Sequence, residues 1–229
     1  LDYDGIEGIE KAKDSLLGGK NGKARVVRDA NGRLVESVVR LEEMQPGQDV
    51  YLSIDRRIQY LAYKELKTRV SELNAKAGSV VVLDAHSGEI LAMANVPSFN
   101  PNNREAIEPY LYRNRAVTDK SEPGSTLKPL TIAAALEARV LGADVEINTS
   151  PGKINFGKYV VKDPKDYGSV SLPMLLAKSS NVGASRVALL MDARQHWMFL
   201  SRLGFGRAPD AGFSGETQGK LTNYAQWGK

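Results

Sequence analysis

The sequence contains no cysteine and only two histidines among its 229 residues. Without cysteine no disulfide can form, so an oxidising compartment would not expose the chain to mispaired thiols. His86 lies in a predicted turn and His196 beside Trp197 in a predicted helix, and neither has carboxylates at the spacing of metal ligands. The sequence therefore predicts no metal site, no cofactor and no Ser-His-Asp triad.

Long hydrophobic runs are also missing. No stretch approaches the roughly 20 apolar residues that cross a bilayer as a helix, and residues 1–4, Leu-Asp-Tyr-Asp, do not look like a signal peptide. The composition, 42% hydrophobic and 25% charged, is that of a globular protein. The formal net charge is +4, but basic and aromatic residues do not gather in one segment, so no nucleic-acid partner is predicted.

Turn signals divide the chain into two parts. Residues 1–48 are rich in glycine and charge, include a predicted hairpin around Asn31-Gly32, and end at the Pro46-Gly47 break. Residues 49–229 form the second predicted domain. Its apolar spacing predicts these elements: a helix from about 54 to 74, strands at 79–84 and 89–93, and helices at 126–139, 172–178, 182–191 and 194–203. Two consecutive strands flanked by helices indicate an α+β fold with an antiparallel sheet.

A serine and a lysine lie three residues apart, Ser125 and Lys128, directly after Pro123-Gly124. The break predicts a helix that begins at about Ser125, and residues three apart share a helix face, so we expect the Lys128 amine to reach the Ser125 hydroxyl. A base makes a serine hydroxyl nucleophilic, and a lysine with a lowered pKa can be that base. Because Lys128 precedes a proline, we also expect it to avoid helical backbone angles.

A second pair, Ser179 and Asn181, lies in a predicted turn between two helices. A hydroxyl and a carboxamide two residues apart can relay a proton and hold a peptide amide. Taken singly, Ser125 and Ser179 could each be helix caps. The same spacings recur at 150–153 and 98–100, where Pro and Gly, or a cluster of Asn and Pro, indicate turns.

Together the two pairs resemble the first two signature motifs of penicillin-binding proteins and class A β-lactamases. Further segments extend the resemblance along nearly the whole chain to class B penicillin-binding proteins, specifically the division-type (septal) D,D-transpeptidases of Gram-negative bacteria. The matching segments are 5–10, 52–55, 88–95, 100–103, 113–116, 122–129, 178–183 and 212–216. Asn181 favours the division type, because elongation-type relatives usually carry Asp there.

The resemblance implies a serine transpeptidase fold and assigns four catalytic residues. It makes Ser125 the nucleophile that forms an acyl-enzyme, Lys128 its base, Ser179 the proton donor to the leaving amine, and Asn181 the group that holds the acyl-chain amide. The implied substrates are peptidoglycan stem peptides, with β-lactam antibiotics as inhibitors and divisome membrane proteins, including a glycosyltransferase, as partners. It also makes residues 1–48 the end of a non-catalytic pedestal, and implies the periplasmic face of the inner membrane and an N-terminal membrane anchor outside this chain.

The sequence departs from the family at one motif. The third signature, Lys-[Ser/Thr]-Gly on an edge strand, does not occur in the 229 residues. We therefore expect the domain to be incomplete at its C-terminal end, and expect that strand, with one oxyanion donor, to come from further polypeptide. Two other functions stay open at this point: a serine β-lactamase, which would hydrolyse the acyl-enzyme, and a non-catalytic penicillin-binding scaffold or sensor.

Overall fold

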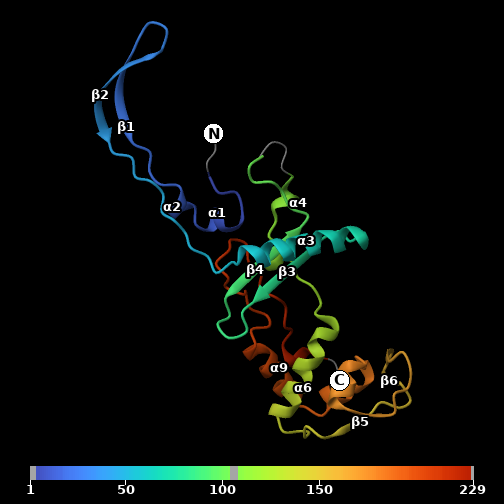
Figure 1. The fold of residues 1–229 in the computed structure, drawn as a ribbon. Coiled ribbons are helices and arrows are strands. Elements are labelled where there is room, and N and C mark those ends of the chain that lie inside the picture. The colour runs from blue at the N-terminus through green and yellow to red at the C-terminus, as the bar shows by residue number, and fades with distance from the viewer. Residues whose placement is uncertain (1–3, 104–107, 228–229) are drawn as a thin grey trace. The chain divides into compact units, whose positions relative to one another are not determined.

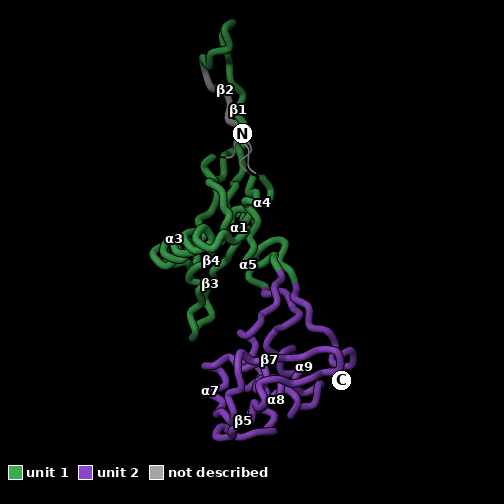
Figure 2. The backbone as a smooth tube through the Cα atoms, turned by 90° about the vertical axis from the view of Figure 1, so that its right-hand side faces the viewer, with its two compact units in different colours: residues 1–119, 210–217 green, residues 120–209, 218–229 purple. Residues whose placement is uncertain are grey.

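The computed structural model describes residues 4–103 and 108–227. The chain divides into two compact units, unit 1 (residues 1–119 and 210–217) and unit 2 (residues 120–209 and 218–229), coloured separately in Figure 2. The named strands pair antiparallel, and helices accompany them in both units. The predicted combination of helices and antiparallel strands is confirmed. Within the described ranges, no helix is both long enough and apolar enough to cross a membrane.

Unit 1 begins with two short helices and an extended hairpin (Figure 1). Its elements up to the hairpin are α1 (Gly8–Ala12), α2 (Asp14–Leu17), β1 (Lys23–Arg28) and β2 (Leu34–Glu42). The Asp29 carboxylate accepts hydrogen bonds from the backbone N–H groups of Asn31 and Arg33, and Gly32 takes a φ of 79°. Because glycine adopts positive φ without a Cβ clash, the Asn-Gly pair forms the turn that the sequence predicts.

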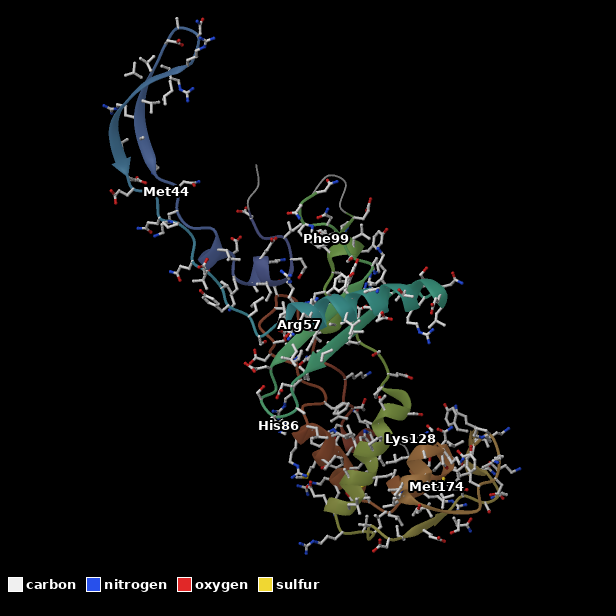
Figure 3. All side chains as sticks on the ribbon, viewed as in Figure 1. Met44, Arg57, His86, Phe99, Lys128 and Met174 are labelled. Carbon is white, nitrogen blue, oxygen red and sulfur yellow. The ribbon has the colours of Figure 1, made fainter. Side chains whose placement is uncertain are left out.

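A helix and a second hairpin form the rest of unit 1. Asp55 caps α3 (Arg56–Glu72), and α3 packs on β3 (Gly78–Leu83) and β4 (Ile90–Val96). A Cβ at Gly78 would lie 2.8 Å from Leu66 Cδ1, so glycine permits this close packing. His86 lies at the predicted turn between the two strands (Figure 3). In the described part of the chain β3 and β4 pair only with each other, and the short helices α4 (Pro109–Tyr112) and α5 (Arg115–Thr118) follow.

Unit 2 is a helical cluster with short strands at its side. Its elements are η1 (Gly124–Leu127), α6 (Lys128–Glu137), β5 (Glu146–Asn148), β6 (Lys153–Phe156), β7 (Tyr159–Lys162), β8 (Ser169–Ser171), α7 (Leu172–Ala177), α8 (Asn181–Leu189), α9 (Ala193–Arg202) and η2 (Tyr224–Gln226). The predicted helices at 126–139, 172–178, 182–191 and 194–203 are all present, with ends shifted by no more than two residues. Strand β5 pairs with β8, and β6 pairs with β7.

One apolar core holds unit 2 together. Residues of α6, α7 and α8 meet there with side chains from β5 and β8: Ile132, Ala134, Ala135, Ile147, Val170, Leu172, Leu175, Ala184, Val187 and Met191. Leu175 on α7 and Val187 on α8 are both 0% exposed. Burying an aliphatic side chain of this size contributes about 1.5–3 kcal/mol. The core therefore fixes the start of α6 and the α7–α8 turn, which carry the candidate catalytic residues.

The strands β5 to β8 were not predicted. Each is only three or four residues long, which is too short for a clear alternation of apolar and polar residues. The β6–β7 turn contains Gly157 with a φ of 56°, but no Asn-Gly pair marks it. These strands form because their partners lie nearby in the folded chain, and local sequence does not reveal that.

Candidate functional site

Ser125 lies in a 3-10 turn just before helix α6. Gly124, with a φ of 56°, opens η1, and the backbone N–H of Lys128 donates to the carbonyl of Ser125. Helix α6 begins at Lys128, three residues later than predicted, with Pro129 in its first turn. Lys128 has φ −59° and ψ −42°, so the expectation that it avoids helical angles is wrong. A proline in the first turn does not interrupt a helix, because N–H groups there have no intrahelical partner.

Ser179 and Asn181 lie where α7 ends and α8 begins, as predicted. Ser179 has a φ of 52°, in the left-handed region that non-glycine residues seldom adopt. Ser180 is the N-cap of α8: its side chain accepts a hydrogen bond from Gly183 N at 2.8 Å. It is 0% exposed, whereas Ser179 and Asn181 are exposed. The buried residue between them thus anchors the turn and leaves the two candidate catalytic side chains accessible.

The Lys128 amine connects the two motifs. It donates to the Ser179 backbone carbonyl at 2.5 Å, to Ser179 Oγ at 2.9 Å and to Asn181 Oδ1 at 2.7 Å. Figure 3 labels Lys128 at the start of α6. A lysine that meets three oxygens in this way is held in one orientation, so residues more than 50 positions apart in the chain form one site.

The Ser125 hydroxyl contacts Ser179 and not Lys128. The Ser125 and Ser179 Oγ atoms are 3.1 Å apart and hydrogen-bonded, and the structure contains no Lys128–Ser125 hydrogen bond. The direct contact expected from helical spacing is therefore replaced by a chain of Ser125 Oγ, Ser179 Oγ and Lys128 Nζ. The direction of each O–H in such a chain can reverse without moving a heavy atom. The geometry can thus carry a proton from Ser125 through Ser179 to a neutral Lys128.

Two opposing effects act on the pKa of Lys128. Partial burial lowers its pKa below the ordinary value of 10.5, because an apolar environment disfavours the charged amine. The negative charge of Asp163 acts in the opposite direction, but the net shift is downward. A larger fraction of the amine is therefore neutral at a given pH than for a solvent-exposed lysine, which is what a general base needs.

Sequence reasoning missed Asp163, which follows β7. Its carboxylate accepts hydrogen bonds from Ser180 Oγ at 2.5 Å, Asn181 N at 2.5 Å and Val182 N at 3.1 Å. The preceding carbonyl, that of Lys162, accepts from Asn181 Nδ2 at 2.9 Å. The one signal in the sequence is an acidic residue directly before a proline, at 163–164, and this is too common to single out.

A hollow of about 300 Å³ adjoins Lys128 and Asn181. Its walls come from η1, α6, β7 and α8, and their side chains are small or apolar apart from Lys128, Asn181, Thr131 and Ser185. The serines and asparagines of the repeated spacings lie elsewhere: Ser150 donates to Asp166 at 2.9 Å in a loop, and Ser98 bonds to Tyr63 in unit 1. Both are turn residues, as predicted.

Comparison with known proteins agrees with this geometry. The model of the penicillin-binding protein transpeptidase domain matches residues 78–228, and the model of the penicillin-binding protein dimerisation domain matches residues 1–52. The chain belongs to the penicillin-binding protein transpeptidase family. The family resemblance drawn from the sequence is confirmed, including the match of its first residues to a non-catalytic module.

Named relatives cover the whole chain. It is 43% identical over 229 residues to the "Probable peptidoglycan D,D-transpeptidase PenA" of Neisseria gonorrhoeae, a match that covers 99% of this chain and 39% of that protein. It is 40% identical over 227 residues to the "Peptidoglycan D,D-transpeptidase FtsI" of Escherichia coli K12, covering 99% and 38%. The transpeptidase domain of penicillin-binding protein 3 from Burkholderia pseudomallei superposes with a TM-score of 0.68 at 34% identity, covering 80% and 50%. The chain thus spans about two fifths of these curated relatives.

Proposed function

We propose that the protein is a peptidoglycan D,D-transpeptidase that uses Ser125 to form an acyl-enzyme during septal wall synthesis. The observation that carries the proposal is the hydrogen-bonded chain from Ser125 Oγ through Ser179 Oγ to Lys128 Nζ. It places a nucleophile and a base with a lowered pKa in one connected site. Relatives named peptidoglycan D,D-transpeptidases, at 43% and 40% identity over 99% of this chain, support the choice of reaction.

In the proposed reaction the Ser125 oxygen attacks the carbonyl carbon of the penultimate D-Ala of a stem peptide. Its proton passes to Ser179, whose own proton passes to Lys128. The carbon–nitrogen bond then breaks, and Ser179 returns a proton to the departing D-Ala amine, which leaves an ester on Ser125. An amine of a second stem peptide attacks this ester, an amide forms, and Ser125 recovers its hydrogen.

Two groups around Ser125 fit roles in binding the acyl chain. The Ser125 N–H lies in the first turn of η1, where N–H groups lack intrahelical partners, and it would stabilise the oxyanion. The Asn181 amide donates one hydrogen to the Lys162 carbonyl and keeps a second. We assign that second hydrogen to the acyl-chain amide of the substrate. The third motif is absent from these residues, so the second oxyanion donor is assigned to further polypeptide.

The wider setting of the activity belongs to the same proposal. Residues 1–48 would be the end of a pedestal module and residues 49–229 part of the catalytic domain. The protein would work at the periplasmic face of the inner membrane, held there by an anchor outside this chain. Division proteins, among them a glycosyltransferase, would be its partners. Support for a septal role comes from the similarity to the E. coli protein named FtsI.

Labelling with a fluorescent penicillin tests the function in the intact protein. A β-lactam should acylate Ser125, and Ser125→Ala should abolish the label. Ser150→Ala is the matched control, because Ser150 has the same spacing to a lysine but bonds to Asp166 in a loop. Label that persists for hours supports a transpeptidase, whereas loss within seconds would indicate a β-lactamase. Absence of label on the wild-type protein would contradict the proposal.

A further inference from the structure

Asp163 joins the two hairpin strands β6 and β7 to the catalytic turn. Its backbone N–H donates to the Gly152 carbonyl at 3.0 Å, which fixes the residue against the loop before β6. Its carboxylate accepts one hydroxyl and two backbone N–H groups from three consecutive residues, Ser180 to Val182. These N–H groups belong to the N-terminus of α8, where the helix dipole favours a negative charge.

The same carboxylate acts on Lys128 through its charge. Of the described residues, the elements around the amine present Ser125 and Thr131 from η1 and α6, and Ser179 and Asn181 from the turn. From β7 and α8 come Val161, Ala184, Ser185 and Ala188. None of these side chains ionises, so Asp163 is the ionised group that influences the amine in this part of the protein.

We propose that Asp163 is a positioning residue that both fixes the Ser179–Asn181 turn and sets the proton affinity of Lys128. The inference rests on the proposed function, because it concerns the base of that reaction. The two effects are separable. Hydrogen bonds to the carboxylate orient Ser179 and Asn181, and the charge opposes the loss of the Lys128 proton. Removing the charge should ease that loss, and removing a hydrogen bond should disturb the orientation alone.

The test is the rate of acylation of Ser125 by a fluorescent penicillin, measured against pH in the intact protein. In the wild type the rate should rise with pH to a plateau, with a midpoint below 10.5, as the Lys128 amine becomes neutral. Asp163→Asn should lower the plateau about 10- to 100-fold, the loss expected for hydrogen bonds to a charged group. It should also move the midpoint to lower pH, because the opposing negative charge is gone.

Two further variants separate charge from geometry. Ser180→Ala removes a hydrogen bond to Asp163 but keeps its charge, so the plateau should fall about tenfold while the midpoint stays in place. Asp166→Asn is the matched control: Asp166 lies three residues away and accepts bonds from Ser150 and Gly168 within its own loop. It should change neither plateau nor midpoint.

The outcomes distinguish this inference from the proposed function. Wild-type protein that is not labelled at Ser125 would refute the function itself. Labelled wild type together with an unmoved midpoint in Asp163→Asn would overturn the inference, since a merely structural role lowers the plateau alone. Melting temperatures establish that each variant is folded. If Asp163→Asn does not fold, Ser180→Ala still decides, because a wild-type plateau in that variant overturns the positioning role.

Discussion

Lys128→Arg tests whether the Lys128 amine is the base. Arginine keeps the positive charge and can still donate to the Ser179 and Asn181 oxygens, but it does not release its proton at any accessible pH. The variant therefore removes proton acceptance and retains most of the electrostatics. Lys178→Arg is the matched control, because Lys178 is the exposed neighbour of Ser179 and its side chain makes none of the site's hydrogen bonds.

The size of the effect follows from the three contacts of the amine. All three lie within 2.5–2.9 Å, so the wild-type site is already ordered and the base does not have to be recruited. A positioned general base contributes about 100- to 10,000-fold to a rate, which corresponds to about 2.7–5.5 kcal/mol of barrier. We expect the acylation rate of Lys128→Arg to fall by that factor, nearly to the level of Ser125→Ala.

The assay is the second-order rate of labelling by a fluorescent penicillin at a pH on the wild-type plateau. Thermal melting should show that both arginine variants are folded. Lys178→Arg should label at the wild-type rate. If Lys128→Arg keeps more than about a tenth of that rate, it has lost no more than about 1.4 kcal/mol. Lys128 would then not be the base, and the proton of Ser125 would have another destination.

Two stability predictions concern residues outside the proton chain. Gly183→Ala should destabilise the protein by about 1–3 kcal/mol, because the new Cβ would lie 2.7 Å from Leu175 Cδ1 in a packed core; this outweighs the roughly 1 kcal/mol that alanine gains over glycine in a helix. Denaturant unfolding measures it, and the cost should shrink in a Leu175→Ala background; full additivity would refute the clash. Burial lowers the pKa of His196 below 6.5, so the folded state binds its proton less well than the unfolded state. The melting temperature should fall as pH drops from 6.5 through that lowered pKa, and His196→Phe should remove this loss; an identical pH dependence in both proteins would argue against it.

Local sequence predicted those parts of the fold that depend on local interactions. The helices α6 to α9 follow from apolar spacing, and the β1–β2 hairpin follows from Asn31-Gly32. The four site residues were also identified, because two short motifs encode them. The same reasoning was wrong about Lys128 in two respects: its backbone is helical, and its amine contacts Ser179 in place of Ser125. Helical spacing places residues on one face, but the side chain turns to whichever partners offer more acceptors.

The parts that sequence did not reveal depend on contacts between distant segments. Asp163 meets Ser180 and Asn181 across 17 and 18 positions. These contacts form only when the β6–β7 hairpin lies beside α8, and those strands are too short to announce themselves. A polar residue in a loop has many possible roles, and only its surroundings in the fold distinguish them.

The backbone at Ser179 shows how the fold produces the site. In a helix each carbonyl points along the axis toward the N–H four residues ahead. The left-handed φ of 52° at Ser179 breaks this pattern at the end of α7, and its carbonyl and its hydroxyl both accept from the Lys128 amine. Such a conformation costs a non-glycine residue about 1–2 kcal/mol, so surrounding contacts must hold it. Ser180 and Asp163 supply those contacts from the buried side of the turn. The cost of the turn is thus offset where no substrate can reach, and the exposed side is left free for chemistry.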